Sequence, residues 1–193
     1  MFVNLVKMKK YLIYLFLFLF SNCIFISSLK ADINHEDAEP TDNEFSYSYG
    51  ITFDDDGDKM YIVGFDSSDK DIVVQYDLAT PYDVSTKSFE HKLREVGTAN
   101  ATTTILAAIG TSRIHDIRFN DDGSRMYLSM LNEGIKTFQL STPYQISSAS
   151  FLNTRVPSDS GNFLAIEFDT TGRKLFIEDN SEIDEYDVET AFD

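Results

Sequence analysis

The sequence predicts an all-β fold made of three copies of one small antiparallel sheet, with the last copy incomplete. Three observations lead to this prediction. One short pattern of isoleucine, phenylalanine, glycine and a basic residue occurs three times in the same register. Segments rich in β-forming residues lie on both sides of each glycine, as in β-strands. A Thr-Pro-Tyr motif follows the third predicted strand in two copies, and proline ends a strand because it has no N–H group.

The repeat is defined by the shared pattern Ile-x-Phe-x-x-x-Gly-x-Lys/Arg-apolar-aromatic. Its copies begin at Gly50, Asp116 and Ala165, so the offsets between them are 66 and 49 residues. The 17 residues by which these offsets differ lie in loops. Self-similarity with a period of about 50 residues is typical of architectures built from stacked supersecondary units.

Each copy is predicted to form a meander of strands. In the first copy, the first strand contains Ile51 and Phe53, and an Asp-Asp-Asp-Gly turn joins it to a second strand at residues 60–63. A third strand is expected at 72–78, and an outer fourth strand near 88–93. The corresponding third and fourth strands are 135–140 and 150–154 in the second copy, and the third strand of the last copy is 183–188.

Such four-stranded sheets have the size of β-propeller blades, and one sheet alone cannot bury both of its apolar faces. We therefore expect blades at about 46–96, 112–156 and 160–193 to stack into an open or partial propeller with exposed apolar end faces. A sandwich or a solenoid is the alternative. Closed rings need about four or more blades. With three blades, we favour a fragment of a longer reading frame, because the sequence stops inside the repeat unit. The alternatives are closure by self-association through exposed blade faces, and an outer strand supplied by residues 32–45.

The Phe-x-x-x-Gly-x-Lys/Arg-apolar-Tyr core resembles the repeats of the YVTN and lactonase-like propellers and of the related TolB-type propellers. The stretch 76–86, Tyr-Asp-Leu-Ala-Thr-Pro-Tyr-Asp-Val-Ser-Thr, resembles tandem repeats of extracellular bacterial proteins. The resemblance covers about residues 46–193 and implies a β-propeller. It implies little about activity, because propellers carry many functions. The Ser-Pro-Asp-Gly turn that is usual in such repeats lacks its proline in all three copies.

Residues 1–31 have the three parts of a secretory signal peptide. Three lysines precede a largely apolar run of 16 residues, 11–26, and small residues follow it up to Ala31. The run is short for a bilayer span, which needs about 20 residues. Cleavage is therefore favoured over an uncleaved anchor, and a lipoprotein attached through Cys23 is a third alternative. We expect a secreted or periplasmic protein with no stable membrane span after cleavage, in which residues 32–45 form an acidic linker.

The chain is strongly acidic, and its cysteine lies in the predicted signal. The net charge is −16, and removal of residues 1–31 with their four lysines makes it −20. No nucleic acid partner is expected, because phosphate binding depends on Lys and Arg. Cys23 is the only cysteine, so the mature chain would contain no disulfide, no catalytic thiolate and no zinc–thiolate site.

The first strand of each copy would border the central channel of a propeller, where ligands usually bind. The expected ligand-binding residues are Tyr49 and Thr52 in the first copy, His115, Asp116 and Arg118 in the second, and Glu167 in the third. Three of them, His115, Arg118 and Glu167, could form an acid–base group. These positions differ between the copies, as surface residues do, so we expect a binding role rather than a catalytic one.

The first turn is the candidate metal site. Asp54, Asp56 and Asp58 lie together there, and calcium prefers six to eight oxygen ligands. The glycine of this turn recurs in the other copies, whereas the preceding residues change to Asn-Asp-Asp and Asp-Thr-Thr. This pattern favours a turn role over calcium binding, so no cofactor is expected.

The sequence contains no phosphate-binding loop, nucleophile elbow or zinc-protease motif. We therefore expect a secreted, non-enzymatic β-propeller that binds a protein, a glycan or a surface. The alternatives are a lactonase-like, metal-dependent hydrolase and a structural repeat of a larger cell-surface protein. The apolar insertion 97–111 would cover a channel mouth, contact a partner or pack against the first blade.

Overall fold

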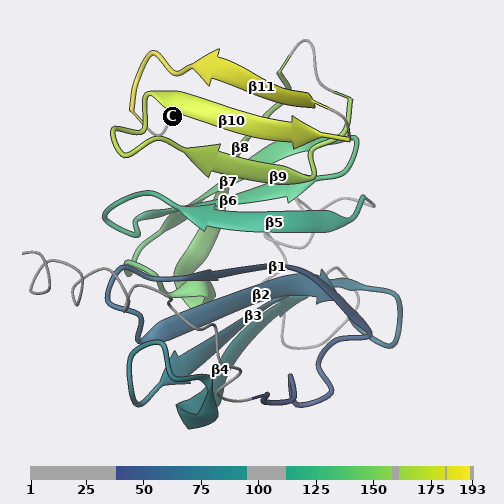
Figure 1. Cartoon of the computed structure of the whole chain (residues 1–193), viewed down its shortest axis with the longest axis vertical. Helices are drawn as coiled ribbons and strands as arrows, with labels where there is room; N and C mark the ends of the chain where they lie inside the picture. Colours follow the sequence, from purple (N-terminus) through teal and green to yellow (C-terminus); the bar gives the residue numbers. More distant parts are fainter. Residues whose placement is uncertain (1–37, 95–111, 158–160, 181, 192–193) are drawn as a thin grey trace, which may run out of the picture. The chain divides into compact units, whose positions relative to one another are not determined.

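The computed structural model describes residues 38–94, 112–157, 161–180 and 182–191 of the chain (Figure 1). All of them belong to the second of the chain's two compact units, 38–193. This unit consists of three antiparallel sheets, none of which is closed. No helix in the described ranges is long and apolar enough to cross a membrane. The predicted signal peptide, 1–31, and the insertion 97–111 lie outside the described residues.

Each strand pairs with its neighbours in the sequence, so every sheet is a simple meander. The first sheet contains β1 (Tyr47–Phe53), β2 (Lys59–Phe65), β3 (Asp71–Leu78) and β4 (Lys87–Arg94). The second sheet contains β5 (Ile114–Phe119), β6 (Arg125–Met130), β7 (Gly134–Leu140) and β8 (Ala149–Arg155). The third sheet contains β9 (Ala165–Phe168), β10 (Lys174–Asp179) and β11 (Glu182–Asp187). Short 3-10 helices, η1 (Val84–Thr86) and η2 (Ile146–Ser148), precede the two fourth strands.

The predicted all-β class is confirmed, as are three antiparallel sheets of which the last has three strands. Each sheet lies within one copy of the sequence repeat. The expected third strands at 72–78 and 135–140 are β3 and β7, each of which begins one residue earlier. The expected fourth strands at 88–93 and 150–154 are β4 and β8. The repeat pattern therefore encodes one recurring supersecondary unit.

One side-chain hydrogen bond recurs in the turn that joins the first and second strands of each sheet. In each case the first turn residue accepts a hydrogen bond from the backbone N–H five residues later. The three bonds are Lys59 N to Asp54 Oδ1 at 3.0 Å, Arg125 N to Asn120 Oδ1 at 2.7 Å, and Lys174 N to Asp169 Oδ1 at 2.9 Å. Since asparagine serves as well as aspartate, the bond requires an oxygen acceptor rather than a charge.

Glycine is required in these turns for two reasons. Gly57 has a φ of +73°, in the left-handed region that glycine enters without steric cost. A Cβ atom at Gly57 would also lie 2.2 Å from the ring of Tyr82. A Cβ atom at Gly123 would likewise lie 2.2 Å from the ring of Tyr144. The Thr-Pro-Tyr motif thus places its tyrosine against the glycine turn of its own sheet.

The three sheets pack face to face through apolar side chains (Figure 1). Between the first and second sheets, the Tyr61 ring lies 4.5 Å from the Phe119 ring, centroid to centroid. Between the second and third sheets, the equivalent Tyr127 and Phe168 rings lie 4.8 Å apart. The same pair of repeat positions therefore joins each sheet to the next. Both tyrosines are buried, so each pair excludes apolar surface from water.

Residues 38–46, here called the strap, cover the other face of the first sheet. They form no strand, so residues 38–45 do not supply the outer strand that was one alternative for 32–45, and residues 32–37 lie outside the described residues. Phe45 packs on a cluster of six buried residues of β2 and β3, as do Phe53 and Val84, and the Tyr76 hydroxyl donates to the Thr41 carbonyl at 3.0 Å. The six buried residues are Met60, Ile62, Ile72, Val74, Tyr76 and Leu78.

Three ion-pair contacts attach the strap further. Lys92 pairs with Glu44, and Lys87 lies 3.5 Å from Asp42 and 3.9 Å from Glu39. The expectation that apolar end faces are exposed is therefore wrong for the first sheet. Its apolar residues are buried, and Phe45, from a segment expected to form an acidic linker, packs on them together with Phe53 and Val84. The described part of that segment, 38–45, is held by a phenylalanine and by pairing of its acids with lysines.

Candidate functional site

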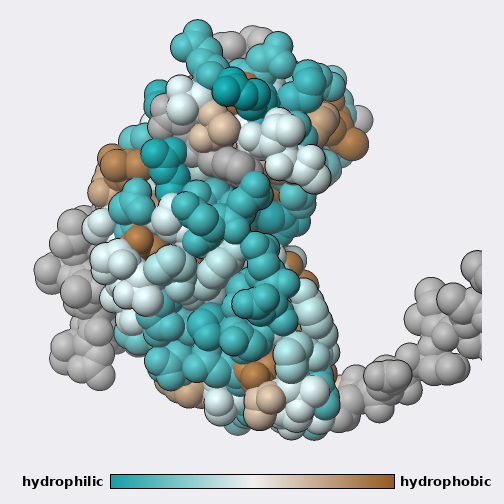
Figure 2. Space-filling view, turned by 90° about the vertical axis from the view of Figure 1, so that its left-hand side faces the viewer, coloured by the Kyte–Doolittle hydropathy of each residue, from teal (hydrophilic) through white to brown (hydrophobic). Residues whose placement is uncertain are grey.

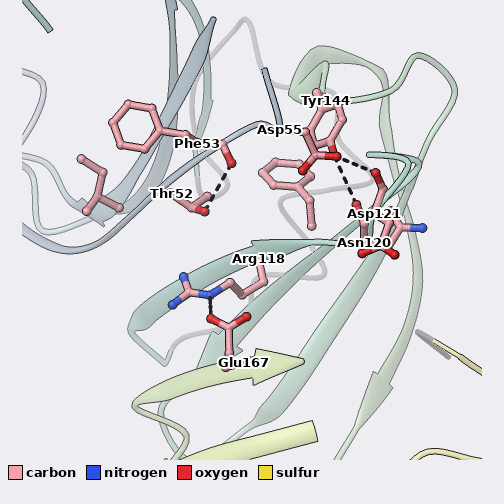
Figure 3. Close-up of a pocket in the computed structure, with 10 residues that line it drawn as sticks. Thr52, Phe53, Asp55, Arg118, Asn120, Asp121, Tyr144 and Glu167 are labelled. Atoms are coloured by element: carbon pink, nitrogen blue, oxygen red, sulfur yellow. Dashed lines mark hydrogen bonds and ion pairs between the residues drawn. The ribbon is translucent and has the colours of Figure 1, made fainter. Parts of the chain in front are cut away.

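The first strands of the three sheets lie next to one another, and their carboxyl ends form an open cavity of about 390 Å³ (Figures 1 and 3). Thr52, Arg118 and Glu167 occupy the same position of the repeat, and all three line this cavity. We name it the inter-sheet groove. Its lining consists of Ile51, Thr52, Phe53, Asp55, Arg118, Phe119, Asn120, Asp121, Tyr144 and Glu167. Three of the six predicted ligand-binding residues are thus brought together.

Arg118 is the central polar residue of the groove. Its Nε donates to Glu167 Oε2 at 2.9 Å, which joins the second sheet to the third (Figure 3). Its Nη1 donates to Asp116 Oδ1 at 2.7 Å and to the Ile117 carbonyl at 2.8 Å. The guanidinium plane is therefore fixed by several acceptors at once, which gives Arg118 a defined orientation.

Asp116, another predicted site residue, lies behind the groove and is buried. Its Oδ1 accepts from the Ile117 N–H at 2.9 Å, and its Oδ2 accepts from the Ile166 N–H at 3.1 Å. Burial raises the pKa of this carboxyl, while Arg118 and the two backbone N–H groups oppose the rise. Because both oxygens are occupied by the fold, Asp116 positions Arg118 and joins two sheets rather than facing a ligand.

The aromatic side of the groove comes from the first two sheets. The Phe119 and Tyr144 rings lie 5.4 Å apart at an angle of 53°, and Phe53 lines the cavity from the first sheet. The Tyr144 hydroxyl donates to the Asp121 carbonyl at 3.1 Å. Burial raises the pKa of this hydroxyl, so it remains neutral. The groove therefore combines ring faces with a defined set of polar groups.

The remaining polar groups are mainly hydrogen-bond acceptors. Asp55, Asp121 and Glu167 contribute carboxylates, whereas the Asn120 amide is engaged in its own turn, where it accepts from the Arg125 N–H and donates to Asp122 Oδ1 at 2.9 Å. The Glu167 side chain is 64% exposed, so it is accessible from solvent. The ten lining residues include no histidine, cysteine, serine or lysine. This composition is suited to hydrogen bonding of a polar ligand, and it lacks the nucleophile–base pairs of acyl transfer.

Tyr49 and His115 lie elsewhere and do not line the groove. Their rings stack on each other, with centroids 4.6 Å apart and an angle of 15° between the planes. Burial lowers the pKa of His115, and the nearby Arg113 lowers it further, against a smaller opposing effect of Glu178. A neutral imidazole stacked on a tyrosine joins the first and second sheets. The acid–base group that His115, Arg118 and Glu167 could have formed is therefore not assembled in one cavity.

The candidate metal ligands Asp54, Asp56 and Asp58 are residues of a turn. Asp54 is buried and accepts the recurring backbone hydrogen bond, as Asn120 does in the second sheet. Asp58 is occupied in part by an ion pair with Lys59, at 3.2 Å. Across the described part of the chain, no three or more His, Cys, Asp or Glu side chains are grouped to hold a metal ion. The donor set of this turn does not fit calcium, which needs about six converging oxygens.

Several groove residues were missed by sequence reasoning, namely Ile51, Phe53, Asp55, Phe119, Asn120, Asp121 and Tyr144. Tyr144 could have been found from its motif, because Thr-Pro-Tyr recurs where the glycine turn recurs. From the sequence alone, the proline of this motif indicates only the end of a strand. Its tyrosine instead folds back over the turn and contributes a wall of the groove.

Figure 2 shows one face of the molecule, on which hydrophilic residues predominate and apolar residues form small separate patches. Comparison of the sequence with protein-family models finds no matching family, and comparison with curated proteins finds no significant match. The assignment of a function therefore depends on the geometry of the groove and of the sheets.

Proposed function

We propose that the three sheets are blades of an open or partial β-propeller and that this scaffold binds a ligand without transforming it. Three features support the propeller arrangement. The sheets repeat in sequence, they pack face to face through equivalent rings, and their first strands lie adjacent. Adjacent first strands are the arrangement by which propeller blades surround an axis.

The binding site is the inter-sheet groove, and the ligand is a neutral, hydroxyl-rich molecule of the glycan class. The observation that carries this proposal is the convergence of Thr52, Arg118 and Glu167 from three sheets on one open cavity. Carboxylates accept hydrogen bonds from sugar hydroxyls, and aromatic faces pack against the apolar face of a sugar ring. Anionic ligands are disfavoured, because three carboxylates line the cavity and Arg118 is already paired.

A glycan-binding assay tests the proposal directly. The purified chain would be screened against a panel of neutral and acidic glycans, and hits would be measured by calorimetry. We expect binding to neutral glycans that falls at least tenfold in Glu167→Ala and in Asp121→Ala. Asp56→Ala, which removes an exposed carboxylate outside the groove, is the matched control and should bind as the wild type does.

Two results would contradict the proposal. One is the absence of any glycan that binds more weakly to the groove variants than to the control. The other is calcium-dependent cleavage of esters or lactones that is lost in Glu167→Ala, which would favour the lactonase-like alternative. Protein partners would then be sought by the same comparison of groove variants with the control.

We also propose that the chain acts outside the cytoplasm. The support is the sequence of residues 1–31, in which lysines, an apolar run and small residues follow in the order of a signal peptide. Amino-terminal sequencing of the secreted chain should give a start near residue 32. A chain that is recovered from the cytoplasm with residues 1–31 intact would contradict this proposal.

A further inference from the structure

The inter-sheet groove has two parts of different chemistry, which lie on opposite faces of β5. Consecutive side chains of a strand point to opposite faces of its sheet. Phe119 accordingly faces the first sheet, where its ring lies 4.5 Å from that of Tyr61, centroid to centroid. Arg118 faces the third sheet, where its Nε donates to Glu167 Oε2 (Figure 3). Both residues line the same cavity, so the cavity passes across β5.

The part between the first and second sheets is here called the ring half-site and consists of Thr52, Phe119, Asp121 and Tyr144. Its two rings lie 5.4 Å apart. The Tyr144 hydroxyl donates to the Asp121 carbonyl, and Asp121 is exposed. Aromatic rings beside an exposed carboxylate suit the apolar face of one sugar ring and one of its hydroxyl groups.

The part between the second and third sheets is here called the ion-pair half-site and consists of Arg118 and Glu167. Arg118 donates through Nε to Glu167 Oε2, and through Nη1 to Asp116 and to the Ile117 carbonyl. Among the described residues, no hydrogen bond occupies Arg118 Nη2 or Glu167 Oε1. The Glu167 side chain is also largely exposed. The ion pair thus holds an available donor next to an available acceptor.

A donor beside an acceptor matches two adjacent hydroxyl groups of one molecule. One hydroxyl oxygen accepts a hydrogen bond from Arg118 Nη2, and the neighbouring hydroxyl donates one to Glu167 Oε1. A ligand carboxylate in this place would be repelled by Glu167, and a ligand ammonium would be repelled by Arg118. Adjacent hydroxyls of a sugar ring carry neither charge, so they fit the pair better than an ionic group does.

The two half-sites are separated by more than one sugar ring can cover. Strands β1, β5 and β9 lie side by side in this order (Figure 1). Since even hydrogen-bonded strands lie about 4.8 Å apart, Thr52 on β1 and Glu167 on β9 are separated by roughly 10 Å or more. The cavity volume of about 390 Å³ lies in the range of sites that hold drug-sized molecules. A ligand that uses both half-sites therefore contains at least two linked sugar units.

We propose that the inter-sheet groove binds an oligosaccharide segment of two or more units, which crosses β5. One unit packs on the rings of Phe119 and Tyr144, and another presents two adjacent hydroxyls to Arg118 Nη2 and Glu167 Oε1. This inference rests on the proposed function, and it adds the minimum length of the ligand and the residues that determine specificity at each end.

A length series tests the inference. Malto-, cello-, manno- and xylo-oligosaccharides of one to six units would be titrated into the purified chain by calorimetry. In at least one series, we expect the affinity to rise at least tenfold from the monosaccharide to the trisaccharide. In Glu167→Ala this gain should disappear, because the second unit has lost its carboxylate. Asp56→Ala, which removes an exposed carboxylate outside the groove, is the matched control and should keep the gain.

The contact with adjacent hydroxyls is tested with two modified trisaccharides of the series that binds. Each is methylated at two neighbouring ring hydroxyls of one terminal unit, so that the two compounds differ in the end that is modified. One of them should bind the wild type as weakly as the unmodified trisaccharide binds Glu167→Ala. Glu167→Ala should weaken that compound no further, since the effects of groups in contact are not additive.

The outcomes separate this inference from the proposed function. A monosaccharide that binds as tightly as the trisaccharide would overturn the inference and leave glycan binding in place. The same holds if the gain with length survives in Glu167→Ala, or if both methylated trisaccharides bind as the unmodified one does. Absence of binding in all four series would contradict the inference and the proposed function together.

Discussion

The first and third sheets are copies of one unit, yet they end differently. The first sheet has all four strands, and the strap packs on its outer face with Phe45 against the apolar residues of β2 and β3. The third sheet has three strands, and its equivalent of Val73, Ile183, is exposed. In the first sheet the outer face is buried and β3 is paired along both edges, whereas in the third sheet no described strand pairs with the outer edge of β11.

The sequence differences between the two sheets agree with this contrast. Positions that contact the strap carry residues suited to it, because Tyr76 donates to Thr41 and Lys92 pairs with Glu44. The second sheet has Phe138 and Thr154 at these two positions, and it faces the first sheet rather than a strap. One repeat pattern can therefore form the same sheet next to a strap or next to another sheet, when a few residues on its outer strands change.

The largest expected effect compares equivalent aromatic residues of the second and third sheets. Phe138 is completely buried between two sheets, whereas Tyr186 is only partly buried. We expect Phe138→Ala to lower the free energy of unfolding by about 3–5 kcal/mol. Tyr186→Ala should lower it by roughly 1–2 kcal/mol, because less apolar area is lost. Urea unfolding measures both values, and equal losses would show that the third sheet is as enclosed as the second.

A second expected effect concerns the carboxylate that joins the second and third sheets. Asp116→Ala leaves the N–H groups of Ile117 and Ile166 without their carboxylate acceptor and frees Arg118 from one partner. The loss of stability should be about 2–3 kcal/mol. Asp56→Ala, an exposed change, should stay within about 0.5 kcal/mol of the wild type. If Asp116→Ala left the free energy of unfolding unchanged, the packing of the two sheets would not depend on this side chain.

The strap gives a smaller effect. Tyr76→Phe removes the hydroxyl that bonds to Thr41 and converts the position to the residue found in the second sheet. We expect a loss of about 1 kcal/mol, the net contribution of one hydrogen bond. Limited proteolysis should then cleave within 38–46 sooner than in the wild type. Unchanged stability together with unchanged cleavage would contradict a packed strap.

The smallest effect is the pH dependence contributed by His115. Burial, and then Arg113, hold its folded pKa below the ordinary value of 6.5. As the pH falls below that value, the unfolded chain binds the proton more readily, so stability decreases. His115→Phe keeps a ring on Tyr49 and should make this decrease less steep. Burial also lowers the pKa of His91, and the contribution of His91 to the pH dependence of stability remains in the variant. Identical slopes from pH 7 to 5 for both proteins would contradict this assignment.

The sequence predicted the units of the fold because the determinants of each unit are local. The glycine turn, the alternation of Ile51 with Phe53 and the Thr-Pro-Tyr break all act within one repeat. The strap could not be predicted in the same way, because residues 38–46 have no periodic pattern and their contacts are to residues far along the chain. Phe163 is buried in the cluster between the second and third sheets. It was missed for the same reason, because it lies before the third copy of the repeat and outside its pattern.

The site was predicted in part. Thr52, Arg118 and Glu167 were found from their equivalent positions, because equivalent residues of stacked sheets lie near one another. Tyr49 and His115 were grouped with them by proximity in sequence. Alternation of side chains along β1 and β5, with an irregularity in both strands, places these two rings against each other instead.

Amide hydrogen exchange of the third strands tests the central contrast most directly. In β3 and β7 both edges are paired, so we predict that nearly all amides are protected along their lengths. In β11 only the amides bonded to β10 should be protected, and the alternate ones should exchange at rates close to those of an unfolded peptide. Protection of every second amide in β11 would support an open edge, whereas continuous protection equal to that of β3 and β7 would contradict it.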